Sequence, residues 1–199
     1  AKLSAEESDT ENTNKEIHIL DACAAPGGKA LTIATGVRST LAADCSESRM
    51  RMVQENAKRT GVKVNCVVAD AHNPPIKSTD VILLDVPCTG TGTLARHPDI
   101  RWRLSPDSVS KITRVQDRLL DSAAPLVRVG GLLIYSTCTL EPEENHSLVE
   151  SFLLRNPGFE LEPSDTVDGE FLDESGYLCV HPDKDGRDGS FAARLRRMH

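Results

Sequence analysis

The 199-residue chain lacks features that would place it outside the soluble globular proteins. No apolar run approaches the roughly 20 residues that a bilayer-spanning helix needs, and no signal-peptide pattern opens the chain. We therefore expect no membrane partner. Hydrophobic residues make up 39%, and the length suits one α/β domain with its own core.

The six cysteines lack the spacing of a disulfide framework or a zinc site. There is no CxxC pair and no histidine at a suitable distance in the sequence, so we predict no bound metal. Several cysteines lie in apolar, strand-like runs, where a free thiol behaves as a small hydrophobic group. Reduced thiols indicate an intracellular protein, in the cytoplasm or, as the alternative, in a chloroplast or mitochondrion.

The chain also lacks the positive charge that is usual in a protein that binds nucleic acid by itself: its formal net charge is −7. The charge is uneven, with seven Lys or Arg against four Asp or Glu over residues 96–128. Residues 139–188 hold three basic and fourteen acidic residues. A local basic face suits a phosphate backbone, although an ordinary solvated surface explains the same counts.

The chain divides into a polar segment and one structured domain. Residues 1–16 have no periodicity and are predicted to be a tail or a linker from a missing upstream domain. The chain begins with Ala1 rather than Met, so we expect a piece of a longer protein. Residues 17–199 form the predicted domain.

Within that domain, predicted strands alternate with predicted helices. The strands cover residues 17–20, 40–43, 64–69, 81–84 and 132–135, followed by two short antiparallel edge strands at 159–161 and 191–195. Helices are predicted from residue 28 and over 47–59, 106–127 and 142–155. This alternation predicts a mostly parallel sheet covered by helices on both faces.

The first four strands each lead to an aspartate: Asp21, Asp44, Asp70 and Asp85. In open α/β sheets the ligand crevice lies beyond the carboxyl ends of the strands, so four acidic groups are expected at one crevice. The turn of residues 21–29, DACAAPGGK, is rich in small residues and glycine, which let the backbone approach a ligand. It matches neither a Walker loop nor a GxGxxG turn. Together with Asp44 and Asp70 it favours a nucleoside-type cofactor over a purely structural turn.

DACAAPGGK resembles the S-adenosylmethionine-binding signature of the Sun/Fmu (NOL/NOP/Sun) group of RNA (cytosine-5) methyltransferases. The resemblance implies a Rossmann-like class I methyltransferase fold with a mostly parallel, seven-stranded sheet. It implies that Asp44 binds the ribose, that Asp70 lies by the adenine, and that Asp85 lies near the sulfonium and the target base. The methionine and ribose end would be lined by Cys23, Ala24, Ala25, Pro26, Gly27, Gly28 and Lys29. Ala30 replaces the threonine that is usual in the family.

Two cysteines follow neighbouring predicted strands: Cys88 in DVPCTGTG and Cys138 in YSTCT. Methylation at carbon 5 of cytosine needs a thiolate that adds to carbon 6, because carbon 5 alone is a weak nucleophile. A lone cysteine is more simply a buried hydrophobic group, but two at strand ends among Pro, Gly, Ser and Thr are hard to explain as core packing. By the resemblance, Cys138 is the nucleophile, Cys88 assists product release, and Asp85 completes the catalytic set.

The same motifs weigh against two other methyltransferase types. In DNA cytosine-5 enzymes the PC cysteine attacks and STCT is not part of the pattern, so RNA is the expected partner. Amino-group methyltransferases usually carry (D/N)PP(Y/F) at this strand end, whereas this chain has DVPC. A non-catalytic cofactor-binding or RNA-scaffolding protein is the alternative from another class. The retained Asp85 and both cysteines disfavour it.

A candidate RNA-binding loop follows Cys88. Arg96, His97, Arg101 and Trp102 offer groups that stack on bases or neutralise phosphates, although Trp102 is equally compatible with packing against the domain. Lys29 is a further candidate at the base pocket, or else a phosphate or helix contact. The string RHPDIRW is similar to the methyltransferase B subgroup, which favours small-subunit ribosomal RNA over transfer RNA.

The resemblance covers about residues 17–197, with residues 17–199 as the methyltransferase catalytic domain. It includes a terminal DGSFAARLRR, in which Ser190 replaces a bulky residue. Family members usually carry an N-terminal RNA-binding domain, which we expect to be the missing part and to supply RNA affinity that an acidic chain lacks. We expect a monomer.

Overall fold

The computed structural model describes residues 16–199, without the side chains of residues 184 and 185. The tail predicted over residues 1–16 lies outside these described residues, apart from its last residue. Among the described helices, none combines the length and the apolar character needed to cross a membrane.

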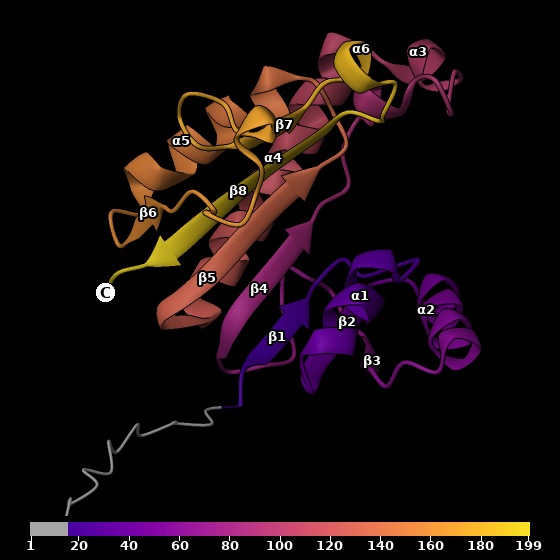
Figure 1. Cartoon of the computed structure of the whole chain (residues 1–199), viewed down its shortest axis with the longest axis vertical. Coiled ribbons are helices and arrows are strands. Elements are labelled where there is room, and N and C mark those ends of the chain that lie inside the picture. The colour runs from indigo at the N-terminus through magenta and orange to yellow at the C-terminus, as the bar shows by residue number, and fades with distance from the viewer. Residues whose placement is uncertain (1–15) are drawn as a thin grey trace, which may run out of the picture.

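One sheet, in the strand order β3-β2-β1-β4-β5-β8-β6, forms the centre of the molecule (Figure 1). Pairing is parallel from β3 to β5, whereas β8 runs antiparallel to β5, β6 and β7. Seven strands make this path, as predicted, and the short β7 adds an eighth that pairs with β8 beside it. The strands are β1 (His18–Asp21), β2 (Ser39–Asp44), β3 (Asn65–Val68), β4 (Thr79–Asp85), β5 (Val127–Thr137), β6 (Phe159–Leu161), β7 (Leu178–Val180) and β8 (Ser190–Arg197).

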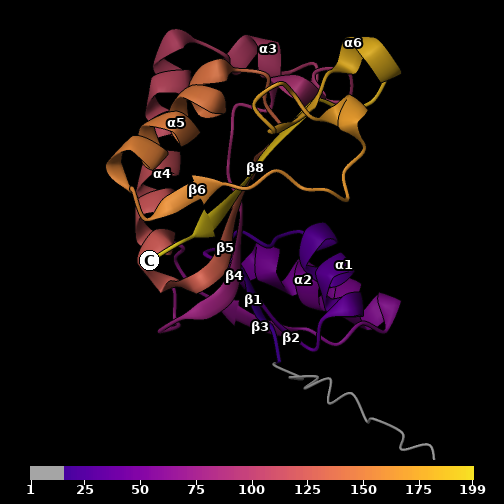
Figure 2. The same cartoon turned by 60° about the vertical axis from the view of Figure 1, so that its left-hand side comes forward.

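The helices cover both faces of the sheet, as the alternation predicted. Figure 2 shows α4 and α5 on one side of the strands and α1 and α2 on the other. The α-helices are α1 (Gly28–Gly36), α2 (Glu47–Thr60), α3 (Ile100–Arg103), α4 (Pro106–Ala123), α5 (His146–Arg155) and α6 (Pro182–Asp185). The strand order reverses between β1 and β4, the position where ligand crevices form in open α/β sheets.

Local sequence explains where the helices begin. Gly27 precedes α1 with a φ of 109°, and a Cβ at this position would lie 3.2 Å from Val53, so the turn requires glycine. Ser46 caps α2 by accepting a hydrogen bond from the Arg49 amide. Ser105 and Ser108 form a reciprocal capping box at the start of α4.

The core lies between the central strands and α4. Leu20, Ile82, Leu84 and Leu133 are at most 1% exposed, and Leu120 of α4 packs into the same cluster. Burying such side chains contributes about 1.5–3 kcal/mol each. This core fixes the strand ends, and with them the residues that follow each strand.

The structure corrects several predicted boundaries. The helix predicted over residues 142–155 begins as a 3-10 turn (Pro142–Glu144), and α5 starts only at His146, because Asn145 has a non-helical backbone. The strand predicted over 132–135 begins at Val127, since α4 ends at Ala123 and a short 3-10 turn follows.

Two further corrections concern β3 and β8. β3 ends at Val68, so Asp70 lies two residues beyond the strand rather than at its end. β8 is not an edge strand, because it lies between β5 and β6. The small elements α3, α6 and β7 were not predicted.

Candidate active site

The two cysteines meet above the carboxyl ends of β4 and β5. The pairing of Asp85 with Ser136 sets the strand ends level, and each cysteine follows its strand by one to three residues. Their sulfur atoms lie 3.1 Å apart, and the Cys138 amide donates to the Cys88 sulfur at 3.4 Å. The structure therefore brings together two thiols that are 50 residues apart in the sequence.

The thiol pair is electrostatically asymmetric. The hydrogen bond with Cys88 lowers the pKa of the Cys138 thiol, against the opposing effects of burial and the nearby Asp85. The same hydrogen bond, together with burial, raises the pKa of Cys88. Because a thiolate is the reactive form of cysteine, this pair has one activated sulfur and one protonated partner.

Asp85 connects the cysteines to the first turn of α1. Its Oδ2 lies 2.7 Å from Lys29 Nζ, and its Oδ1 accepts a hydrogen bond from Ser136 Oγ at 2.8 Å. The Lys29 side chain thus reaches Asp85 but lines neither of the two cavities described below, so its role at the base pocket stays a prediction. Ser136, which precedes Cys138 by two residues, was not singled out from the sequence.

A cavity of about 350 Å³ lies beyond the strand ends. Asp44, Asp70 and Asp85 line it, together with both cysteines of the pair. Val115 and Leu119 of α4 supply an apolar wall. The volume is within the range of small-molecule sites, and the mixture of carboxylates and apolar walls suits a nucleoside-type ligand.

The glycine-rich segment divides into lining and shaping residues. Ala22, Cys23 and Ala25 of residues 21–29 line the cavity, while Ala24 is packed in a small core cluster. Pro26 and Gly27 form the turn, which Asn56 holds by a hydrogen bond to the Pro26 carbonyl. Gly28 and Lys29 begin α1.

Asp44 and Asp70 differ in burial. Asp44 is 3% exposed, and its Oδ1 accepts from the Ser46 amide at 2.9 Å while Oδ2 lies 3.4 Å from Arg49. Asp70 is largely exposed, and hydrogen bonds from the His72 amide and ring lower the pKa of its carboxyl. Arg49 and His72 also line the cavity. They were not predicted as site residues, because their only sequence signal is a position a few residues after a strand.

Asp21, the fourth aspartate expected at this crevice, ends β1 but does not line the cavity, because its side chain is buried in the protein interior. It is fully buried, its Oδ1 accepts from the Cys23 amide at 3.4 Å, and its Oδ2 has no hydrogen-bond partner within the described chain. Burial, reinforced by the charge of Asp85, raises the pKa of Asp21 to about 7.

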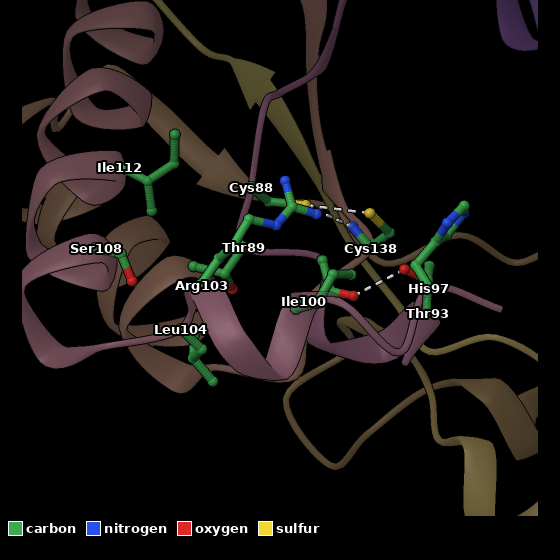
Figure 3. Close-up of a pocket in the computed structure, with 11 residues that line it drawn as sticks. Cys88, Thr89, Thr93, His97, Ile100, Arg103, Leu104, Ser108, Ile112 and Cys138 are labelled. Carbon is green, nitrogen blue, oxygen red and sulfur yellow. Dashed lines mark hydrogen bonds between the residues drawn. The ribbon is translucent and has the colours of Figure 1, made fainter. Parts of the chain in front are cut away.

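A second cavity, of about 460 Å³, lies on the other side of the cysteine pair (Figure 3). Figure 3 shows Ser108 and Ile112 of α4 on one side of it and the two sulfurs joined across its floor. Its remaining wall comes from the segment after Cys88 and from α3. The lining is Cys88, Thr89, Gly90, Thr93, His97, Ile100, Arg103, Leu104, Ser108, Ile112 and Cys138.

The predicted RNA-binding residues are placed unequally. His97 lines the second cavity, whereas Arg96 forms an ion pair with Asp188. Trp102 is 85% exposed, so the alternative that it packs against the domain is wrong. Arg101 is exposed beside it. Arg103, which the sequence analysis did not select, reaches the cavity instead.

One group of possible metal ligands lies outside the cavities. His146 Nε2, Asp173 Oδ2 and Cys179 Sγ are within 4.8 Å of one another. His146 Nε2 and Asp173 Oδ2 are already 2.7 Å apart, a hydrogen bond that ties the loop before β7 to the start of α5. The sequence did not indicate this group, because its members are far apart along the chain.

Solved structures define the class of fold. The chain is 35% identical to NSun6 from Pyrococcus horikoshii, with a TM-score of 0.82 over 92% of this chain and 48% of that one. TrmN from Thermus thermophilus, at 22% identity and a TM-score of 0.60, shares the fold alone. Together with the strand order, these similarities show a Rossmann-like, class I methyltransferase fold.

Sequence comparison then shows the family. The chain belongs to the 16S rRNA methyltransferase RsmB/F family, whose model matches residues 10–196. It is 39% identical to the ribosomal RNA small subunit methyltransferase B of Vibrio vulnificus over 183 residues, which are 89% of this chain and 41% of the relative. The corresponding protein of Salmonella arizonae is 37% identical, over 89% and 42%. The chain thus spans less than half the length of these relatives, and the family resemblance drawn from its sequence is confirmed.

Proposed function

We propose that this chain transfers a methyl group from S-adenosylmethionine to carbon 5 of a cytosine in RNA, with small-subunit ribosomal RNA as the substrate. The observation that carries the proposal is the pair of sulfurs, 3.1 Å apart, on the border between two cavities. Such a border lets one cavity hold a methyl donor and the other a nucleotide, with the nucleophile reaching both. The names of the family and of its relatives supply the ribosomal substrate.

The residues of the first cavity fit the cofactor. Asp44, buried at the end of β2, would accept hydrogen bonds from the ribose hydroxyls, and exposed Asp70 on the wall of the same cavity would lie by the adenine. One carboxylate oxygen of buried Asp21 has no hydrogen-bond partner among the described residues. Asp21 directly precedes the lining residues Ala22 and Cys23, and an unpartnered carboxylate oxygen there suits a positively charged ligand group. When bound, the cofactor supplies an electrophilic methyl group on a sulfonium.

The protein's own groups account for the remaining chemistry. The Cys138 thiolate adds to carbon 6 of cytosine, and the electron pair displaced from the 5,6 double bond makes carbon 5 nucleophilic. Asp85, held by Lys29 and Ser136, orients the base through its N3 edge. After methylation the carbon 5 proton passes to a solvent water, the electron pair of that C–H bond re-forms the 5,6 double bond, and Cys138 leaves carbon 6 as a thiolate, a release that Cys88 assists.

RNA reaches the second cavity along a basic flank. Helical spacing places three exposed cations of α4 beside the residues that line both cavities: Lys111, Arg114 and Arg118. Exposed Trp102, which lies in the chain between the lining residues Ile100 and Arg103, offers a stacking surface for a base. Residues 17–199 would be the catalytic domain, acting as a monomer in the cytoplasm, with an upstream RNA-binding domain contributing further affinity.

The test is methyl transfer from labelled S-adenosylmethionine to unmodified small-subunit ribosomal RNA, followed by nucleoside analysis of the product. Label in 5-methylcytosine supports the proposal. Label in another nucleoside, or in DNA with RNA unlabelled, would overturn it. Tight cofactor binding with no transfer to RNA, even after the upstream region of a relative is supplied, would favour a binding protein.

A further inference from the structure

A buried carboxylate lies directly behind the cysteine pair. Glu144 is 0% exposed, although it belongs to the acidic run Glu141-Pro142-Glu143-Glu144, whose other glutamates reach the surface. The 3-10 turn at Pro142–Glu144 points it inward. A buried carboxylate is costly unless its oxygens are hydrogen-bonded, so the contacts of this side chain explain its position.

Those contacts come from the residues that follow each cysteine. The Thr89 amide donates to Glu144 Oε2 at 3.0 Å, and the Thr89 hydroxyl donates to Oε1. The Thr139 hydroxyl donates to Oε1 at 3.3 Å, and the two threonine hydroxyls are 2.8 Å apart. One carboxylate thus holds the residue after Cys88 and the residue after Cys138.

A second layer of hydrogen bonds fixes the carboxylate itself. Gln116 of α4, also fully buried, donates from Nε2 to Glu144 Oε2 at 2.8 Å and to the Pro87 carbonyl at 2.9 Å. Tyr135 of β5 donates its hydroxyl to the Glu144 carbonyl at 2.7 Å. The hydrogen bonds around Glu144 therefore join α4 and β5 to the two cysteine loops, the segments that directly follow Cys88 and Cys138.

We propose that Glu144 is a positioning residue that sets the spacing of the two cysteine loops and so maintains the hydrogen bond between Cys88 and Cys138. The proposal deepens the proposed function and rests on it for the roles of the two cysteines. Glu144 lines neither cavity and contacts neither sulfur, so it acts through Thr89 and Thr139 (Thr89 is drawn in Figure 3).

The consequence is measurable on the free protein. The hydrogen bond with Cys88 is the largest influence that lowers the pKa of Cys138. If the loops separate, that bond is lost and the Cys138 thiolate forms at higher pH. A residue that only supported overall stability would leave this titration unchanged in the molecules that remain folded.

The experiment follows the pH dependence of Cys138 alkylation by iodoacetamide, read by peptide mass spectrometry on the whole 199-residue chain without RNA. We expect Glu144→Ala to raise the midpoint by about one pH unit. Its surface neighbour provides the matched control, Glu143→Ala, which keeps the wild-type midpoint. Glu144→Gln should keep the alkylation midpoint close to the wild-type value. The glutamine amide oxygen can accept hydrogen bonds from Thr89 and Gln116, while its NH₂ donates to the threonine hydroxyls.

An unchanged midpoint in folded Glu144→Ala would overturn the proposal. An equal shift in Glu144→Gln would assign the effect to charge and overturn the positioning role. If Glu144→Ala does not fold, Thr89→Val combined with Thr139→Val removes both threonine hydroxyls from Glu144 Oε1, while the Thr89 amide keeps its bond to Oε2, and must raise the midpoint. Since alkylation needs no RNA, failure here is distinguishable from failure of the proposed methyl transfer.

Discussion

The two cavities that meet at Cys88 and Cys138 are built in different ways. In the proposed function the first cavity is the cofactor side and the second is the substrate side. The cofactor-side cavity is lined mostly by residues at or just after the ends of β1, β2, β3 and β4, so short turns after strands form most of its wall. The substrate-side cavity is enclosed by loops and the two helices α3 and α4, and side-chain hydrogen bonds between residues about 50 positions apart hold its floor. The wall of the cofactor-side cavity therefore depends on short stretches of sequence. The wall of the substrate-side cavity depends on contacts between residues far apart in the sequence.

The largest effect that separates the two sides is expected from Cys138→Ala. Loss of the nucleophile should lower methyl transfer about 10³-fold or more, because carbon 5 is no longer activated. Cofactor affinity, measured by calorimetry, should stay at the wild-type value. Cys66→Ala, on β3 and away from both cavities, is the matched control. A fully active Cys138→Ala protein would exclude the assignment.

The converse change is Asp44→Ala on the cofactor side. It removes a buried carboxylate that suits ribose hydroxyls and also holds the Ser46 amide. We expect the Kd for the cofactor to rise about 10- to 100-fold, the value of one charge-assisted hydrogen bond. Cys138 alkylation should be unchanged. Glu47→Ala, an exposed acid nearby, controls for general charge. Equal cofactor affinity in Asp44→Ala would remove Asp44 from the site.

A smaller effect is expected at the substrate-side rim. Trp102→Ala removes an exposed stacking surface, so the KM for RNA should rise about tenfold, with kcat and cofactor affinity little changed. Steady-state kinetics with varied RNA measure this. Leu154→Ala, equally exposed on α5, is the control, and the same KM for both variants would show that Trp102 does not contact RNA.

A last expected effect concerns the stability of the protein without ligand rather than binding or turnover. Because burial raises the pKa of Asp21 to about 7, the folded state holds a proton that the unfolded state releases near pH 4. Asp21 therefore lowers stability progressively as pH rises from about 4 to about 7, by an amount on the order of a few kcal/mol. In Asp21→Asn the loss of stability between pH 5 and pH 8 should be smaller, as denaturant unfolding at both pH values would show. Parallel losses in both proteins would refute the shifted titration.

The same division separates what the sequence could predict from what it could not. The sheet, its helices and the strand-end carboxylates follow from hydrophobic periodicity and from Gly and Asp at turns. Asp44, Asp85 and Cys23 accordingly line one cavity beyond the strand ends. The assignment of functions to them came from the family resemblance and stays a prediction.

The substrate side contained most of the missed residues. Glu144 resembles any surface acid in a run of glutamates, and only the burial of its side chain distinguishes it. Gln116 and Arg103 are ordinary polar residues of helices until the fold brings them to the cysteines and the cavity. Such residues are defined by tertiary contacts, for which a single sequence carries no local signal.

The central claim, that Cys138 attacks and Cys88 releases, is tested most directly by trapping the covalent complex. Cys88→Ala is incubated with labelled small-subunit RNA and S-adenosylmethionine, then analysed by denaturing electrophoresis beside Cys138→Ala and the double variant. We predict an RNA–protein adduct in Cys88→Ala, and none in either protein that lacks Cys138. An adduct formed by Cys138→Ala would contradict the assignment and reverse the two roles.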